Sequence, residues 1–205
     1  VNTPSSEALM RQVLLGNGYF EKEFGKRSYD IFLVDCFGFR HALPSIGAHM
    51  GLKGFSTQKL NWGVGTPILV EGGEALRPVP DETSPRMDLG KWVGPDGNYL
   101  VACFNENFYS YHFEHYGEDP INQRELHKKE VEHNEKYAGV AVRNLYYGIG
   151  DEGGSCGEVS AAMAEAAFCD PDGGFFETIS ASSDQIFLEL TEEQIAGLPI
   201  YRDGL

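Results

Sequence analysis

Hydrophobic residues recur at helical spacing through the first part of the chain, where they predict a helix over residues 3–24. Thr3 is its expected N-cap, Pro4 suits the first turn and Gly25 ends it. Next come an apolar run at Ile31–Val34, a short helical pattern at 44–50 that Gly51 closes, and a second strand predicted around 54–57. This order of strand, helix and strand is typical of a βαβ unit, so the pattern predicts an α/β fold.

The pattern changes between residues 63 and 90, where glycines and prolines interrupt any regular period. We expect a long loop there, of the kind that covers a site as a lid. A hairpin is predicted next, with strands at 92–93 and 99–102 joined by a turn at Asp96-Gly97. Further helices are predicted over 119–137, 158–168, 183–190 and 191–196.

Two apolar runs end on carboxylates. Ile31–Val34 leads directly into Asp35, and a second run, predicted as a strand from Asn144, ends at Gly150, Asp151 and Glu152. Side chains at the carboxyl ends of parallel strands project into the mouth of the sheet, where ligands bind. Asp35 and Asp151 would then face one mouth, where a pair of acids can break a glycosidic bond. The alternative for each acid is a helix N-cap or a turn residue.

Composition narrows the range of partners. The chain of 205 residues has 31 acidic and 16 basic residues and a formal net charge of -15, which disfavours nucleic acid and anionic membrane surfaces. Four cysteines without CxxC spacing argue against a zinc ribbon and favour a reducing compartment. We see neither a signal peptide nor an apolar run long enough to span a membrane.

The neighbourhood of the two acids offers further candidates. The glycines from Gly148 to Gly157 either let a sugar approach the backbone or form a tight turn. Trp62 flanks the predicted long loop, where its indole can stack on a sugar ring, and core packing is the alternative.

Several segments together resemble the catalytic domain of the glycoside hydrolase family 38 α-mannosidases, particularly the bacterial branch. The resemblance is carried by Arg11–Phe20, Asp35–Gly38, Lys53–Trp62, Trp92–Gly97 and Tyr146–Gly154, and it extends over nearly the whole chain. It implies a retaining, exo-acting α-mannosidase with a (β/α)7-barrel and one zinc ion. The chain is then expected to be an internal fragment, residues 1–205, of one such domain, from a bacterial cytoplasm or periplasm.

The resemblance also implies roles for individual residues. Asp35 matches the acid that is both nucleophile and zinc ligand, and Asp151 matches the general acid/base, with Glu152 as the alternative. Lys59 matches a basic residue near the nucleophile, and Tyr111 a tyrosine that contacts substrate; with Trp62 they complete the expected substrate-binding set.

The chain departs from the family pattern in the residues that would bind the zinc ion. The His-x-Asp motif that supplies other zinc ligands is missing, and so is a distant His. We therefore expect the isolated chain to bind zinc weakly and to be inactive, whereas the full-length protein would hydrolyse α-mannosidic glycans. The alternative is an inactive carbohydrate-binding or interaction domain on the same scaffold. Whether the full-length protein forms a homo-oligomer is left open by the sequence.

Overall fold

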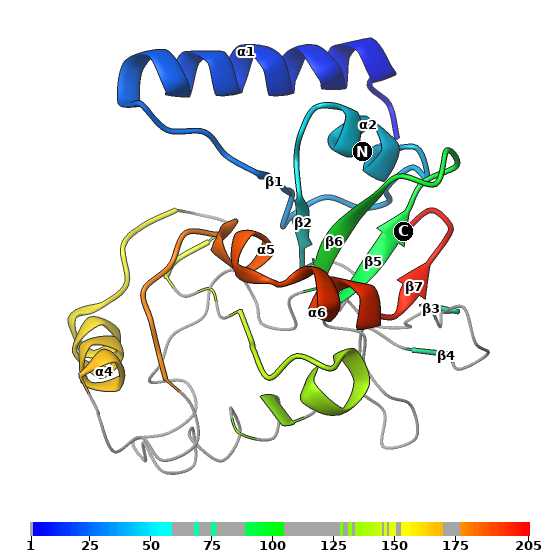
Figure 1. Cartoon of the computed structure of the whole chain (residues 1–205). Coiled ribbons are helices and arrows are strands. Elements are labelled where there is room, and N and C mark those ends of the chain that lie inside the picture. The colour runs from blue at the N-terminus through cyan, green and yellow to red at the C-terminus, as the bar shows by residue number, and fades with distance from the viewer. Residues whose placement is uncertain are drawn as a thin grey trace.

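The computed structural model describes residues 2–58, 68–69, 75–76, 89–104, 128, 131–132, 134–144, 146, 148–150, 153–169 and 177–205. A five-stranded sheet at its centre has the strand order β1-β2-β6-β5-β7, and Figure 1 shows helices packed around it. The strands of this sheet are β1 (Asp30–Phe32), β2 (Gly54–Thr57), β5 (Leu89–Val93), β6 (Tyr99–Phe104) and β7 (Ile200–Tyr201).

Three of the four strand pairs in this sheet are parallel. β1 pairs with β2, β2 with β6 and β5 with β7 in parallel, and only β5 and β6 are antiparallel. The fold is therefore mixed α/β with a mainly parallel sheet, as the sequence predicts at the level of class. The finer prediction of a (β/α)7-barrel is not confirmed, because the described strands form an open sheet with β1 and β7 at its edges.

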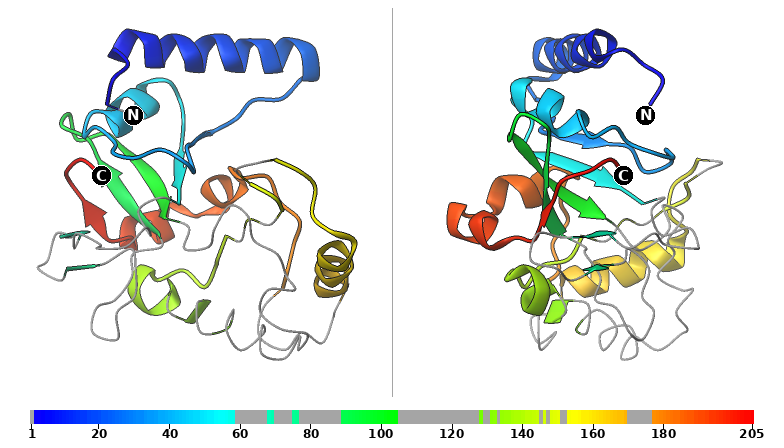
Figure 2. Two further views of the ribbon diagram at one scale, coloured as in Figure 1. Left: turned by 180° about the vertical axis from the view of Figure 1, so that it is seen from behind. Right: turned by 90° about the vertical axis from the view of Figure 1, so that its right-hand side faces the viewer.

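Apolar side chains cover both faces of the sheet, as expected for parallel strands. One cluster includes Phe55, Trp92 and Phe104 and packs against helix α2 (Leu43–His49). The other includes Val101, Cys103 and Phe187, with α5 (Gln185–Glu189) and α6 (Glu192–Gly197) on that face. Figure 2 shows α5 and α6 beside the sheet and α1 as the outermost element, beyond α2.

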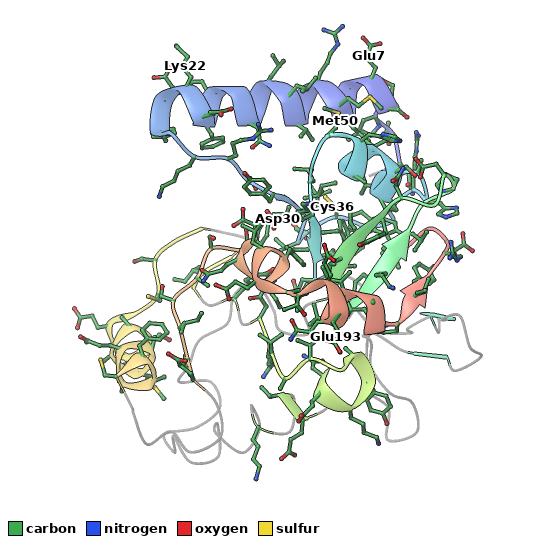
Figure 3. The ribbon with its side chains drawn as sticks, viewed as in Figure 1. Glu7, Lys22, Asp30, Cys36, Met50 and Glu193 are labelled. Atoms are coloured by element: carbon green, nitrogen blue, oxygen red, sulfur yellow. The ribbon has the colours of Figure 1, made fainter. Side chains whose placement is uncertain are left out.

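Helix α1 (Ser6–Phe24) confirms the first predicted helix but not its predicted cap. Ser5 is the N-cap, and its hydroxyl accepts a hydrogen bond from the Ala8 backbone N–H at 3.2 Å. Thr3 and Pro4 precede the cap, because the helix begins two residues later than the position of Pro4 suggests. Gly25 ends the helix with φ 64°, a left-handed conformation that glycine adopts at low cost. In Figure 3, Glu7 and Lys22 point outward near its two ends.

Most of the other local predictions are confirmed. β1, α2 and β2 form the expected parallel βαβ unit, although β1 starts one residue early, at Asp30, and ends at Phe32. The hairpin of β5 and β6 turns at Gly97, which has φ 85°. Helix α4 (Glu158–Phe168) has its predicted bounds and α5 falls inside its predicted range, whereas α6 begins one residue later and ends one residue later than the predicted 191–196. Described residues 128, 131–132 and 134–138 are helical, within the helix predicted over 119–137.

Two regions differ from the prediction, and some residues of each lie outside the part of the chain that the structure describes. Within the predicted loop 63–90, β3 (Ile68–Leu69) and β4 (Ala75–Leu76) form a two-stranded antiparallel sheet, and β5 begins at Leu89; the other residues of this loop are not described. The strand predicted before Asp151 is wrong for the described residues of that segment, which form a turn and one bridge between Ile149 and Gly154. Glycines at 148, 150, 153 and 154 favour the turn over a strand.

Candidate active site

The carboxyl ends of β1, β2 and β6 lie along one edge of the sheet, because these three strands are parallel neighbours. Figure 1 shows α1 and α2 near the end where β2 begins, and α4 beyond the end where it finishes. A hydrogen bond from Leu33 N to Ser56 O, at 2.9 Å, continues the pairing of β1 and β2 past the last residue of β1. Asp35 follows in a turn and is exposed. It therefore lies at the edge where α/β proteins bind ligands.

The segment after Asp35 is anchored in the core. Phe39 is only 2% exposed, and its ring lies 4.9 Å from that of Phe55 in an edge-to-face arrangement. The backbone of Phe39 also pairs with Leu205, whose N–H donates to the Phe39 carbonyl at 2.9 Å. Cys36, labelled in Figure 3, packs against the same core cluster. The turn that carries Asp35 is thus held by strand pairing on one side and by buried aromatic packing on the other.

The backbone conformation at Gly38 explains why the Asp-Cys-Phe-Gly motif ends in glycine. Its φ of 76° lies in the left-handed region, and a Cβ added there would come within 2.8 Å of the Asn2 side-chain nitrogen. Because the end of the exposed Asn2 side chain can shift, it is the positive φ that would strain another residue at this position. The motif therefore combines an acid at the sheet edge with the glycine that lets the chain turn back into the core.

A ring contact brings the segment of the second predicted acid to the same edge. Phe32, the last residue of β1, lies 5.3 Å from Tyr146 between ring centroids, with an interplanar angle of 74°. Tyr146 precedes Asp151 by five residues, and Phe32 precedes Asp35 by three. Two segments more than a hundred residues apart are therefore side by side near Asp35.

The remaining predicted site residues lie outside the part of the chain that the structure describes. The bridge between Ile149 and Gly154 brackets Asp151 and Glu152 without placing either acid. The structure thus brings the two acid-bearing segments together, and the approach of their carboxylates stays a prediction. The predicted site residues outside the description are Lys59, Trp62, Tyr111, Asp151 and Glu152.

A buried polar network fixes the entry to β1. Asp30 is 8% exposed, and its carboxylate accepts hydrogen bonds from the hydroxyls of Ser28 at 3.0 Å and Ser56 at 3.4 Å. Burial raises the pKa of Asp30 above its ordinary value, and the charge of Asp184 adds to the rise against the lowering effect of the serines. Asn17 of α1 is bonded to both backbone groups of Ser28, each at 3.0 Å. The network therefore links α1, β1 and β2.

Asp184 connects α5 to the same strand. Its carboxylate accepts a hydrogen bond from Tyr29 N at 3.0 Å and another from the Ser182 hydroxyl at 2.7 Å. Neither Asp30 nor Asp184 is among the residues that the sequence pattern singles out. A buried acid at the start of a strand carries no distinctive sequence signal, because it becomes visible only when its partners from distant segments are known.

Zinc ligands can be tested against the described residues. Within that part of the chain, no group of three or more His, Cys, Asp or Glu side chains could hold a metal ion. A zinc site needs three or four such ligands, so Asp35 and its described surroundings do not form one. The zinc ion predicted at Asp35 stays a prediction.

Two polar residues at the end of β2 were not singled out by the sequence pattern. Thr57 and Gln58 are 0% and 1% exposed, and the Thr57 hydroxyl and the Gln58 carbonyl oxygen have no hydrogen-bond partner in the described structure. The strand that they close, Gly54–Thr57, has only one large apolar side chain, so it lacks the signal of an apolar run ending on a polar group that drew attention to Asp35.

Comparison with known proteins supports the family resemblance over nearly the full length. Residues 1–204 match the profile of the glycosyl hydrolases family 38 N-terminal domain. The chain belongs to this family. Known proteins align over shorter stretches: the chain is 31% identical to mouse (Mus musculus) alpha-mannosidase 2C1 over 153 residues, which is 75% of this chain and 12% of that protein. Alpha-mannosidase G of Dictyostelium discoideum is 51% identical over 61 residues, 30% of this chain and 6% of that protein.

A solved structure supports the fold. The crystal structure of an alpha-mannosidase from Enterococcus faecalis V583 superimposes with a TM-score of 0.62 at 19% sequence identity, covering 98% of this chain and 20% of that one. The family 38 chain thus spans from 6% to 20% of the proteins compared with it. In the described part of the chain, no helix has the length and apolar character needed to cross a membrane.

Proposed function

We propose that this chain is part of an α-mannosidase in which Asp35 is the catalytic nucleophile. Its membership of family 38 supports a glycoside hydrolase that acts on mannosides. The observation that carries the proposal is the position of Asp35, exposed at the carboxyl edge of three parallel strands and beside the segment that leads to Asp151.

The proposed reaction is a double displacement that retains the anomeric configuration. The Asp35 carboxylate attacks the anomeric carbon while the glycosidic C–O bond breaks, and Asp151 donates a proton to the leaving oxygen. Asp151 then takes a proton from water, whose oxygen attacks the anomeric carbon and releases Asp35. Glu152 is the alternative for this acid/base role. A retaining mechanism requires the two carboxyl groups to approach to about 5–5.5 Å.

We also propose zinc as the cofactor, with Asp35 as one ligand, on the strength of the family resemblance. The described residues do not complete the ligand set of such an ion. Lys59, Trp62 and Tyr111 are the proposed substrate contacts.

The proposal is tested with the full-length polypeptide that contains this chain. We expect Asp35→Asn to lower kcat for hydrolysis of 4-nitrophenyl α-mannoside by about 10³-fold or more, because the variant loses its nucleophile. The matched control is Asp96→Asn, at the hairpin turn on the opposite edge of the sheet, which should retain most of the activity. Equal activity of wild type and Asp35→Asn would reject the assignment. A wild type that binds mannosides without hydrolysing them would favour the inactive binding domain.

A further inference from the structure

The end of β2 buries three polar residues in succession. Ser56, Thr57 and Gln58 are 0%, 0% and 1% exposed. The Ser56 hydroxyl donates to the Asp30 carboxylate, which accounts for its burial. The other two side chains each bury an oxygen that has no hydrogen-bond partner in the described structure. Such an oxygen costs about 1–3 kcal/mol of stability, so a residue that keeps it needs a reason.

The two oxygens differ in where they lie. Thr57 is the last residue of β2 and pairs in register with Phe104 of β6. Side chains two residues apart on a strand share a face, so Thr57 lies on the face of Phe55, which belongs with Phe104 to one apolar cluster. Gln58 is the first residue beyond the strand. It therefore lies at the carboxyl edge of the sheet rather than within its apolar face.

Gln58 and Asp35 lie at the same edge of the sheet, the one at which β1 and β2 end. β1 and β2 are adjacent and parallel, and the bond from Leu33 N to Ser56 O extends their pairing toward Asp35. A buried carboxamide at the same sheet edge as a proposed nucleophile can orient a polyhydroxylated substrate, because its oxygen accepts a hydrogen bond from an O–H group. A buried acceptor that is unsatisfied without ligand is typical of sites that exchange stability for function.

We propose that Gln58 orients the substrate of this site: its carboxamide oxygen accepts a hydrogen bond from a hydroxyl of the bound sugar or from a water molecule that the sugar orders. The inference rests on the proposed function and assigns a further residue to it. It predicts an unusual combination of effects, because removing the oxygen relieves an unpaired buried group in the free protein while it removes a contact from the complex.

The experiment compares Gln58→Met with wild type in the full-length polypeptide. Methionine has a similar length and volume but replaces the whole carboxamide, oxygen and nitrogen, with apolar groups. We expect a melting temperature equal to or above that of wild type, together with a decrease in kcat/KM for 4-nitrophenyl α-mannoside of about 5- to 30-fold, as for the loss of one hydrogen bond. A purely structural role for Gln58 would not separate stability from activity in this way.

Thr57→Val is the matched control, because it removes a buried unpartnered hydroxyl from the adjacent residue at nearly constant volume. We expect it to keep wild-type kcat/KM. Monodeoxy α-mannosides distinguish the two sources of the O–H group. If a sugar hydroxyl is the donor, the substrate lacking it loses kcat/KM with wild type but not further with Gln58→Met. If an ordered water is the donor, each deoxy substrate loses kcat/KM by the same factor with both proteins.

Three results would overturn the inference while leaving the proposed function intact, provided that Asp35→Asn is inactive and wild type is active. These are wild-type kcat/KM in Gln58→Met, an equal loss in Thr57→Val, and a melting temperature of Gln58→Met well below that of wild type. The last would mean that the carboxamide of Gln58 contributes to the stability of the free protein. A wild type without mannosidase activity would instead reject the proposed function, and the inference with it.

Discussion

Replacing Gly54 by alanine tests how tightly α5 packs on the sheet. Gly54 begins β2 and pairs with Asp30 on one side and with Val101 on the other. A Cβ added at this position would overlap three atoms of the Phe187 ring, inside the 3.0 Å that real Cβ atoms essentially never cross. Gly54→Ala therefore requires the ring or the strand to move.

Neither group can move freely. Phe187 is 3% exposed within the second apolar cluster, and Asp184, which caps α5, is hydrogen-bonded to Tyr29 at the start of β1. Overpacking a core generally costs about 1–3 kcal/mol, and an overlap with a constrained ring belongs near the upper end of that range. The smaller chain entropy of unfolded alanine offsets only about 0.4–1 kcal/mol. We expect a net loss of about 2–2.5 kcal/mol.

Urea unfolding of the wild-type chain and of two variants, followed by circular dichroism, measures this loss. Gly18→Ala is the control, because a Cβ at this position in α1 meets nothing within 4 Å and should raise stability by about 0.5–1 kcal/mol. Adding Phe187→Leu to Gly54→Ala should cost less than the sum of the single effects, since the smaller side chain relieves the overlap. A Gly54→Ala variant within 0.5 kcal/mol of wild type would refute the packing argument.

Two further predictions concern the buried acid and a helix cap. Burial raises the pKa of Asp30, so the folded protein holds its proton more tightly than the unfolded chain, and stability from this group falls as pH rises from about 3.8 through the folded pKa. Asp30→Asn should therefore gain stability relative to wild type across that pH range in urea titrations; a pH-independent difference would contradict this. Thr191 accepts a hydrogen bond from Gln194 N in the capping box of α6, so Thr191→Ala should lower stability by about 1 kcal/mol, and no change in the urea midpoint would be the opposing result.

Local sequence signals predicted much of the fold. Apolar runs next to glycine, proline and capping residues located α1, α2, β2, α4 and the β5–β6 hairpin, because those elements are determined largely by neighbouring residues. β7 had no such signal. It has only two residues, Ile200 and Tyr201, and pairs with β5 across more than a hundred residues of chain, so only tertiary packing defines it.

The strand predicted before Asp151 is the opposite case, because the sequence predicts a strand where the described residues form a turn and one bridge. The apolar residues before Gly148 match a buried strand as well as they match a buried turn, and periodicity cannot separate the two over so few residues. The positive φ of Gly148 and Gly153, 128° and 78°, turns the backbone there. The contact of Tyr146 with Phe32 nevertheless brings this segment to the expected edge.

Some residues of the candidate site can be predicted from the sequence and others cannot, and the difference has a physical cause. Asp35 follows directly from the strand before it, so its place at the sheet edge could be predicted from local sequence. Gln58 depends on burial and on the absence of a hydrogen-bond partner among the described residues, and neither property is encoded in the residue type. The network around Asp30 likewise joins α1, β2 and α5, and its members are adjacent only in the folded chain.

The central claim is that Asp35 forms the covalent bond to the sugar. The most direct test treats the full-length polypeptide with a slowly hydrolysed fluorinated α-mannosyl fluoride, digests the trapped protein and locates the adduct by tandem mass spectrometry. The account predicts one sugar adduct, on Asp35, and none in Asp35→Asn. An adduct on another carboxylate, or an active enzyme that forms no adduct, would contradict it.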